Sequence, residues 1–208
     1  MLVEEDIWLD RYASRIDLST YLTHLVKPKV DKDGNTEMNT PKVLKNILES
    51  RKLIGSTTKS GFIVGKRRAV CFQDSPLLSV YQNVLHEKKN REQLGNKRRY
   101  IPTGLAFKKN MVYKAGGRPV IYEQTTVAKD MLPPEEWWRI VNFDLSSENI
   151  IDWTHEREWR VPDEFEFKLE DAILIVPRYK AYKKLFEVFD NDLLKSLGGI
   201  TVLEPFIY

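Results

Sequence analysis

The sequence predicts an α+β fold in which a mixed or split β-sheet is flanked by helices. Strand-like and helix-like stretches are interspersed without the regular strand–helix–strand rhythm of a doubly wound parallel sheet, and the strands crowd the C-terminal half. The 208 residues, with 42% hydrophobic and 11% aromatic content, suffice for one sizeable core. We therefore expect a single domain over residues 1–208, with a helical extension at 1–17 and the core at 21–208.

Composition restricts the possible environments and partners of the chain. Its 33 basic and 30 acidic residues nearly cancel, so the net charge of +3 says little about partners. The one cysteine, Cys71, lies in an apolar run, so no intrachain disulfide forms and a buried, inert thiol is expected. The N-terminus has no signal-peptide pattern, and no apolar run approaches the ~20 residues that cross a bilayer. We expect a cytoplasmic protein without a membrane partner.

The first half of the chain predicts two strand–helix pairs. Residues 21–26 are β-branched and aromatic, which predicts a strand. Thr40 and Pro41 then open a helix, with the threonine as N-cap and the proline at the first helical position. Residues 69–72 predict a second strand, and Ser75 with Pro76 opens a second helix in the same way.

The second half is richer in strands, with glycines and prolines between them. The segments expected to be strands are 100–107, 118–123, 172–176 and 200–203, and those expected to be helical are 108–115, 125–136 and 179–197. Residues 137–145 fit either a strand or a helix. The last helix is expected to bury one side, which carries Tyr182, Leu185, Phe186, Phe189, Leu193 and Leu194.

Residues 152–161 concentrate tryptophans, carboxylates, arginines and a histidine immediately before a proline. Read as a strand, this segment places Glu156, Glu158 and Arg160 on one face and Trp159 on the other. If the tryptophan faces the core, the two carboxylates lie about 7 Å apart on the opposite surface. That arrangement suits stabilisation of a developing cation, and it equally suits an exposed strand with surface salt bridges.

Other motifs are weaker. Residues 61–66 superficially resemble a phosphate-binding loop, but the glycine spacing is one residue short and no Ser or Thr follows the lysine. The histidines lack zinc-ligand spacing and no second cysteine exists, so no metal is expected. Residues 88–99 are the most basic part of the chain, which fits either a solvated loop or a phosphate-facing patch.

Three segments, in this order, resemble the ADP-ribosyltransferase superfamily, and in particular bacterial DarT-like toxins and related abortive-infection proteins. Residues 21–25 with the following helix resemble the histidine-bearing strand and helix of that family. Residues 70–77 resemble its aromatic strand that runs into a Ser-Pro helix start. Residues 156–161 resemble its late strand, including the Glu-x-Glu form of its catalytic glutamate. Together the three segments span roughly residues 21–177.

The resemblance implies an ADP-ribosyltransferase-like split sheet that binds NAD. It implies that Glu158 holds a ribose hydroxyl and stabilises positive charge as nicotinamide leaves, with Glu156 beside it. The residues it assigns to cofactor binding are His24, Thr23, Phe72 and Ser75. The acceptor substrate is expected to contact Asp74, which stands at the position before the Ser-Pro pair. If the acceptor is a nucleic acid, the basic residues Lys97, Arg98 and Arg99 are expected to contact its phosphates.

The expected function is therefore that of an NAD-consuming mono-ADP-ribosyltransferase-like toxin or phage-defence effector. Its acceptor would be a macromolecule, either a protein or a nucleic acid. DarT-like toxins carry an arginine just before the Ser-Pro pair, where this chain has Asp74. The alternative is therefore a catalytically inactive binding module on the same fold, acting as an antitoxin or as a sensor of a phage protein.

Overall fold

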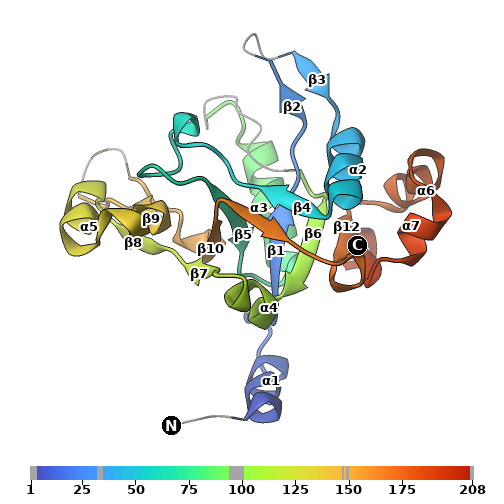
Figure 1. Cartoon of the computed structure of the whole chain (residues 1–208), viewed down its shortest axis with the longest axis horizontal. Helices are drawn as coiled ribbons and strands as arrows, with labels where there is room; N and C mark the ends of the chain where they lie inside the picture. Colours follow the sequence, from blue (N-terminus) through green and yellow to red (C-terminus); the bar gives the residue numbers. More distant parts are fainter. Residues whose placement is uncertain (1–3, 32–34, 94–100, 147, 149, 207–208) are drawn as a thin grey trace. The chain divides into compact units, whose positions relative to one another are not determined.

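The computed structural model describes residues 4–31, 35–93, 101–146, 148 and 150–206 (Figure 1). Their contacts divide the chain into two compact units. Unit 1 comprises residues 1–22, 53–75 and 108–166, and unit 2 comprises residues 23–52, 76–107 and 167–208. Because both units are assembled from interleaved segments, neither corresponds to one continuous stretch of chain. The expected single domain stays a prediction.

Unit 1 is built around an antiparallel group of three strands, with β10 (Glu158–Pro162) between β5 (Ala69–Gln73) and β7 (Arg118–Pro119) (Figure 1). In the β5–β10 register, Glu158 lies opposite Gln73 and Arg160 lies opposite Cys71. The short strands β8 (Ile121–Glu123) and β9 (Ile140–Asn142) form a separate parallel pair. The remaining elements of this unit are α1 (Glu5–Ala13), η1 (Thr58–Ser60), α4 (Lys109–Lys114), α5 (Thr125–Met131), η2 (Pro134–Arg139), η3 (Thr154–Glu156) and β11 (Glu164–Glu166).

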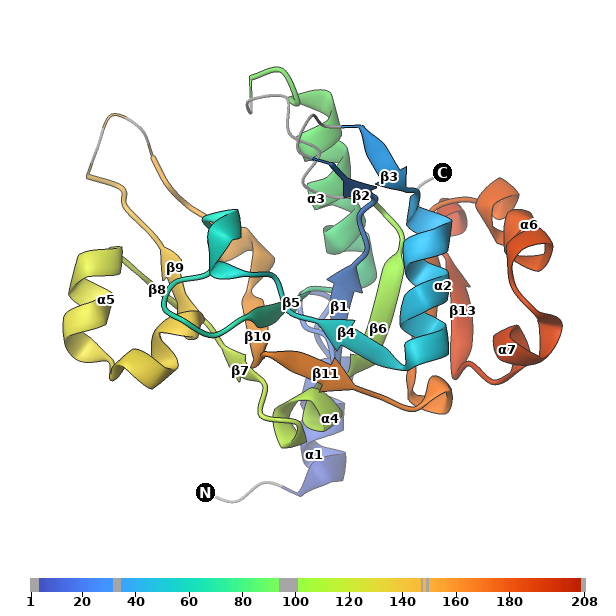
Figure 2. The same ribbon diagram turned by 45° about the horizontal axis from the view of Figure 1, so that its top comes forward.

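Unit 2 contains a mixed group of strands, in which β12 (Ile173–Val176) runs parallel to β13 (Gly199–Val202) and antiparallel to β6 (Gly104–Lys108). Buried Leu174 lies opposite Leu105 in the β12–β6 register, so this sheet contributes directly to the core. The other elements of this unit are β2 (Lys29–Val30), β3 (Thr36–Met38), α2 (Thr40–Ser50), α3 (Leu77–Lys89), η4 (Leu169–Asp171), α6 (Tyr179–Val188), α7 (Asn191–Lys195) and η5 (Glu204–Phe206). Figure 2 shows α6 followed by α7, which leads into β13. Two further strands, β1 (Tyr21–Leu25) and β4 (Lys52–Ile54), contain boundaries between the units.

The expected α+β class, with a mixed sheet and flanking helices, is confirmed. The helix that begins near Thr40 is also confirmed, although its cap is Asn39, whose side chain accepts a hydrogen bond from the Lys42 N–H. Residues 137–145, which fitted either state, contribute the end of the 3-10 helix η2 and then the strand β9. Across the described residues, none of the helices combines the length and the apolar character needed to span a membrane.

The long C-terminal helix expected over 179–197 is wrong, because the chain forms two helices there. α6 ends at Val188, and Asp190 then caps α7 by accepting a hydrogen bond from the Asp192 N–H. An aspartate at such a position competes with helix propagation and starts a new helix instead. The break also changes which side is buried: Leu185 and Phe189 are buried, but Phe186 is 48% exposed.

Unit 2 depends on close approach of two backbones at Gly104 of β6. A Cβ atom added there would overlap the carbonyl oxygen of His24. We predict that Gly104→Ala destabilises the protein by about 1–3 kcal/mol, because backbone must move to relieve the overlap. Gly199→Ala, in β13 of the same unit, is the control, since nothing lies within 4 Å of its added Cβ. Urea unfolding measures both, and equal stability of the two variants would contradict the prediction.

Candidate functional site

The β5–β10 ladder gives unit 1 one face that carries ionisable and polar side chains. Directly opposed residues in an antiparallel pair point to the same side of the sheet, as do residues two apart on one strand. Glu158 and Arg160 of β10 therefore share a face with Gln73 and Cys71 of β5. The other face carries apolar neighbours, including Phe72. The ladder thus separates an ionic side from a hydrocarbon side.

Glu158 and Arg160 form a buried ion pair on the ionic side. Arg160 Nε donates to Glu158 Oε1 at 2.8 Å, and Nη2 donates to Oε2 at 3.2 Å. The side chains are only 8% and 3% exposed, respectively. Both carboxylate oxygens are thus held by one planar guanidinium, the geometry that gives Arg–carboxylate pairs their strength and their fixed orientation.

The remaining donors of Arg160 connect three other segments to β10. Nη1 donates to the carbonyls of Trp138 and Ile140, at 2.8 and 3.0 Å, and Nη2 donates to the carbonyl of Phe62 at 3.2 Å. Burial lowers the pKa of Arg160, but the Glu158 carboxylate and Cys71 together more than offset this, so the pKa lies above its usual value. Arg160 is therefore both the counter-ion of Glu158 and a link from β10 to η2, β9 and the loop after η1.

The sequence interpretation of this segment is correct in part. Glu158 and Arg160 do share a face, opposite Val161, but that face is buried rather than exposed. The expected pairing of Glu156 with Glu158 along one strand is wrong. Glu156 ends η3, and Arg157 adopts a left-handed conformation with φ 46°, so the strand begins only at Glu158. The two carboxylates therefore do not project from one continuous strand.

Tyr122 and Cys71 complete the surroundings of the ion pair. The Glu158 backbone N–H donates to the Tyr122 hydroxyl at 2.7 Å. Burial raises the pKa of Tyr122 to about 12, and the Glu158 carboxylate also raises it. Burial likewise raises the pKa of the Cys71 thiol well above its usual value, with a further contribution from Glu158. Both groups are therefore protonated at neutral pH, which supports the expectation that Cys71 is not a nucleophile.

Asp74 lies immediately after β5, and its carboxylate is engaged on both oxygens. Lys109 Nζ lies 2.7 Å from Oδ1, and Trp159 Nε1 donates to Oδ2 at 3.1 Å. Lys109 is itself buried and also contacts Tyr12 of α1, whose hydroxyl lies 3.3 Å from Nζ. The Asp74 backbone N–H donates to the carbonyls of Glu156 and Arg157. Asp74, expected to bind the acceptor, is a node that connects β5, β10, α4 and α1.

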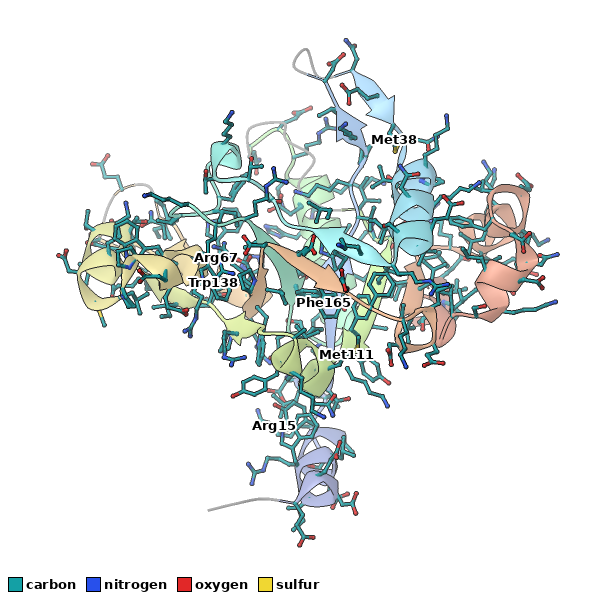
Figure 3. All side chains as sticks on the ribbon, in the orientation of Figure 1. Arg15, Met38, Arg67, Met111, Trp138 and Phe165 are labelled. Atoms are coloured by element: carbon teal, nitrogen blue, oxygen red, sulfur yellow. The ribbon has the colours of Figure 1, made fainter. Side chains whose placement is uncertain are left out.

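The other expected site residues belong to several different elements. Phe72 is buried on the apolar side of the ladder, edge-on to Phe165 (labelled in Figure 3), which separates it from Glu158. Ser75 is buried in the turn before α3. Thr23, which is buried, and His24, which is half-buried, belong to unit 2. The expected acceptor residues Lys97, Arg98 and Arg99 lie outside the described residues.

Sequence reasoning missed several members of the site. The sequence pattern predicts Arg160 only as part of an exposed strand, and it does not indicate Tyr122, Gln73 or Lys109. Gln73 Oε1 and Trp138 Nε1 are buried and have no hydrogen-bond partner among the described residues. An acceptor and a donor of this kind are where a ligand or a water can bind. A glutamine at the end of a buried strand was the available signal for the first of them.

The ionic side offers hydrogen-bond acceptors to a ligand. No group of three or more His, Cys, Asp or Glu side chains comes together in the described part of the chain. A fixed carboxylate beside the unpartnered amide oxygen of Gln73 presents two neighbouring acceptors. Such a pair suits a ligand with adjacent hydroxyls, and the carboxylate stabilises positive charge that develops close to it.

No known protein family, characterised protein or solved structure matches the chain.

The ion pair predicts a large and non-additive cost of mutation. Glu158→Gln leaves the Arg160 charge buried without its counter-ion, which costs about 3–5 kcal/mol. Arg160→Met should cost at least as much, because three carbonyls also lose their donor. The loss of unfolding free energy in the double variant should be smaller than the sum of the two single losses, by on the order of 1–3 kcal/mol. The reason is that each single change already removes the pair.

A urea-unfolding double-mutant cycle measures these costs. The control is Arg67→Met, which breaks the ion pair with Asp163 in the same unit, where both side chains are about half exposed. That change should cost no more than about 1 kcal/mol. If Glu158→Gln proves no more destabilising than the control, the buried pair does not carry the role assigned to it.

The raised pKa of the Tyr122 hydroxyl predicts that the protein loses stability at high pH. Its folded pKa of about 12 exceeds the ordinary value of 10. Between these values the unfolded chain releases the phenolic proton while the folded chain keeps it. The contribution of Tyr122 to the free energy of unfolding is therefore fully present below pH 10, and it is lost as the pH rises towards 12.

The comparison of parent and Tyr122→Phe isolates this contribution. Phenylalanine cannot titrate, so the stability advantage of the parent should shrink between pH 9 and pH 11.5 in urea unfolding. Tyr113→Phe, at a half-exposed ring of the same unit, serves as the control. An advantage that stays constant over this range would show that folding does not shift the Tyr122 pKa.

Proposed function

We propose that this protein is an NAD-consuming ADP-ribosyltransferase-like enzyme, acting as a toxin or phage-defence effector on a macromolecular acceptor. The observation that carries the proposal is the Glu158 carboxylate, held on both oxygens by Arg160. The order of the three segments that resemble ADP-ribosyltransferases adds to it, because their third segment places that family's glutamate at this residue.

The residues around Glu158 fit a ribose in their chemistry. Glu158 and Gln73 are directly opposed acceptors on one face, and the two hydroxyls of a ribose are adjacent donors. NAD, when bound, supplies an ADP-ribosyl group by breaking its bond to nicotinamide, with the electron pair leaving on nicotinamide. Glu158 would hold a hydroxyl of that ribose, and Gln73 would orient the sugar beside it.

Preorganisation is what Arg160 contributes to this chemistry. A carboxylate that must stabilise a developing positive charge acts best when it needs no reorganisation at the moment of reaction. The Arg160 fork fixes the plane of the carboxylate, and the bond from the Glu158 N–H to the Tyr122 hydroxyl fixes its backbone. The acceptor nucleophile gives up its proton to water as its bond to the ribose forms. Arg160 is therefore a positioning residue in this proposal and Glu158 the catalytic one.

A second candidate is a binding module without catalysis, such as an antitoxin or a sensor of a phage protein. Asp74 favours the binding module, because Lys109 and Trp159 already engage both oxygens of its carboxylate. DarT-like toxins carry an arginine at this position. The near-complete burial of Glu158 also suits a purely structural ion pair.

Nicotinamide release from NAD distinguishes the two candidates. We expect the parent to release nicotinamide and Glu158→Gln to lower kcat by roughly a hundredfold or more, as for loss of one electrostatic contact to the transition state. Because this variant is expected to be less stable, the assay belongs at a temperature where near-ultraviolet circular dichroism shows it folded. Arg160→Lys keeps a positive charge without the fork, and should lower kcat less while leaving KM nearly unchanged.

The control for activity is Arg67→Met. Arg67 lies outside the ionic side of the ladder, so this change should leave kcat unchanged. Calorimetry with NAD provides the second readout. A parent that neither releases nicotinamide nor binds NAD at millimolar concentration would exclude the enzyme and favour the binding module.

A further inference from the structure

Helix α6 presents an aromatic and basic surface that the core of unit 2 does not use. Tyr179, Tyr182 and Phe186 follow one another along the helix, with ring centroids 5.9 and 5.2 Å apart. Tyr179 and Phe186 are about half exposed, whereas Leu185 on the adjoining side is buried. Residues 178–188 also carry exposed charges, which are Arg178, Lys180, Lys183, Lys184 and Glu187. The exposed side is thus apolar and predominantly positive.

Helix α1 has the opposite character, and none of its residues is buried. Ile7 and Leu9 are 57% and 42% exposed. The charged side chains of residues 4–13 are Glu4, Glu5, Asp6, Asp10 and Arg11, so acids outnumber bases. Asp6 and Asp10 are four residues apart and therefore lie on one side of the helix. A helix of nine residues is marginal in water on its own, so a helix without buried residues gains from a further contact.

We propose that α6 is a docking surface for α1 of a second copy of this chain. The two surfaces match in charge: Lys180 and Lys183 face an acidic helix, and Glu187 on α6 can pair with Arg11 on α1. They also match in apolar character, because the half-exposed rings of α6 would cover Ile7 of α1. In a two-fold dimer each chain gives one α1 and receives one, so the contact forms twice. This inference does not depend on the proposed NAD chemistry.

A single-stranded nucleic acid fits α6 less well than an acidic helix does. Base stacking needs free ring faces, but Tyr182 stacks against Tyr179 and Lys183 Nζ lies 4.9 Å from the Tyr179 ring centroid. Glu187 interrupts the basic side, and Glu204 accepts a hydrogen bond from the Tyr179 N–H at the start of the helix. A continuous phosphate backbone would meet both carboxylates.

The test is sedimentation velocity of the full chain from low to several hundred micromolar, with charge-reversed variants. The parent should exceed its monomer mass of 24.4 kDa as concentration rises, and less so at high salt. Lys180→Glu/Lys183→Glu, and separately Asp6→Lys/Asp10→Lys, should each weaken self-association at least about tenfold, because like charges then meet. Circular dichroism confirms that each variant is folded.

Mixing the two variants gives the decisive observation. In the mixed dimer one α1–α6 contact is unchanged and the other has both charges reversed, so both are attractive. The mixture should therefore associate although neither variant does so alone, and a chain carrying all four changes should self-associate again. The matched control is Lys168→Glu/Lys195→Glu in unit 2, whose side chains are both 78% exposed, and it should leave association unchanged.

Three results would overturn the proposal. A parent that stays monomeric throughout, self-association that charge reversal on either helix does not weaken, or a mixture that fails to associate would each do so. Fluorescence anisotropy with a twenty-nucleotide oligothymidylate tests the nucleic-acid reading directly. If the parent is monomeric and the Lys180→Glu/Lys183→Glu variant loses oligothymidylate binding, α6 is instead a nucleic-acid surface.

Discussion

The buried ion pair between Glu158 and Arg160 is the constraint on which much of unit 1 depends. A guanidinium in the interior is tolerated only when its charge is balanced and its donors are satisfied. Arg160 meets both conditions by using one carboxylate and three backbone carbonyls. Those carbonyls belong to the 3-10 helix η2, the short strand β9 and the loop after η1, none of which pairs with β10 in a β-ladder. The charge therefore fixes the path of the chain where β-ladder hydrogen bonds do not.

A second polar node, Asp74 with Lys109, acts in the same way just beyond the Glu158–Gln73 end of the ladder. Its two buried or half-buried charges satisfy each other, and Lys109 extends the network to Tyr12. The contact to α1 is thus made through an amine and a phenol ring rather than through an apolar core. Polar contacts of this kind specify one orientation more strictly than hydrocarbon packing, but they add less free energy. These contacts therefore fix the orientation of α1 but add little to its stability.

Periodicity predicted the class of fold and the approximate positions of most elements, because these depend on local sequence. The start of the helix near Thr40 and the polar–apolar alternation of Glu158 to Val161 are examples. The predicted cap residues Thr40 and Ser75 are wrong, since the caps are Asn39 and Pro76. Burial of Glu158 was not predictable, since it depends on Arg160 reaching carbonyls some twenty or a hundred residues away. The left-handed Arg157 that removes Glu156 from the strand has no strong sequence signal either, because glycine or asparagine normally marks such positions.

The interleaving of the two units has a consequence for how the chain is synthesised and folds. Unit 1 needs residues 108–166 before its central strand β10 can pair with β5, some ninety residues earlier in the chain. Unit 2 is completed later in synthesis, because β12 must pair with β6 and β13 must then pair with β12. Contacts between such distant segments carry a loop-closure cost before any gain, which slows folding. The nascent chain therefore leaves one edge of β5 unpaired until β10 has emerged from the ribosome, and one edge of β6 unpaired until β12 has emerged. It is open to misfolding or chaperone binding during that interval.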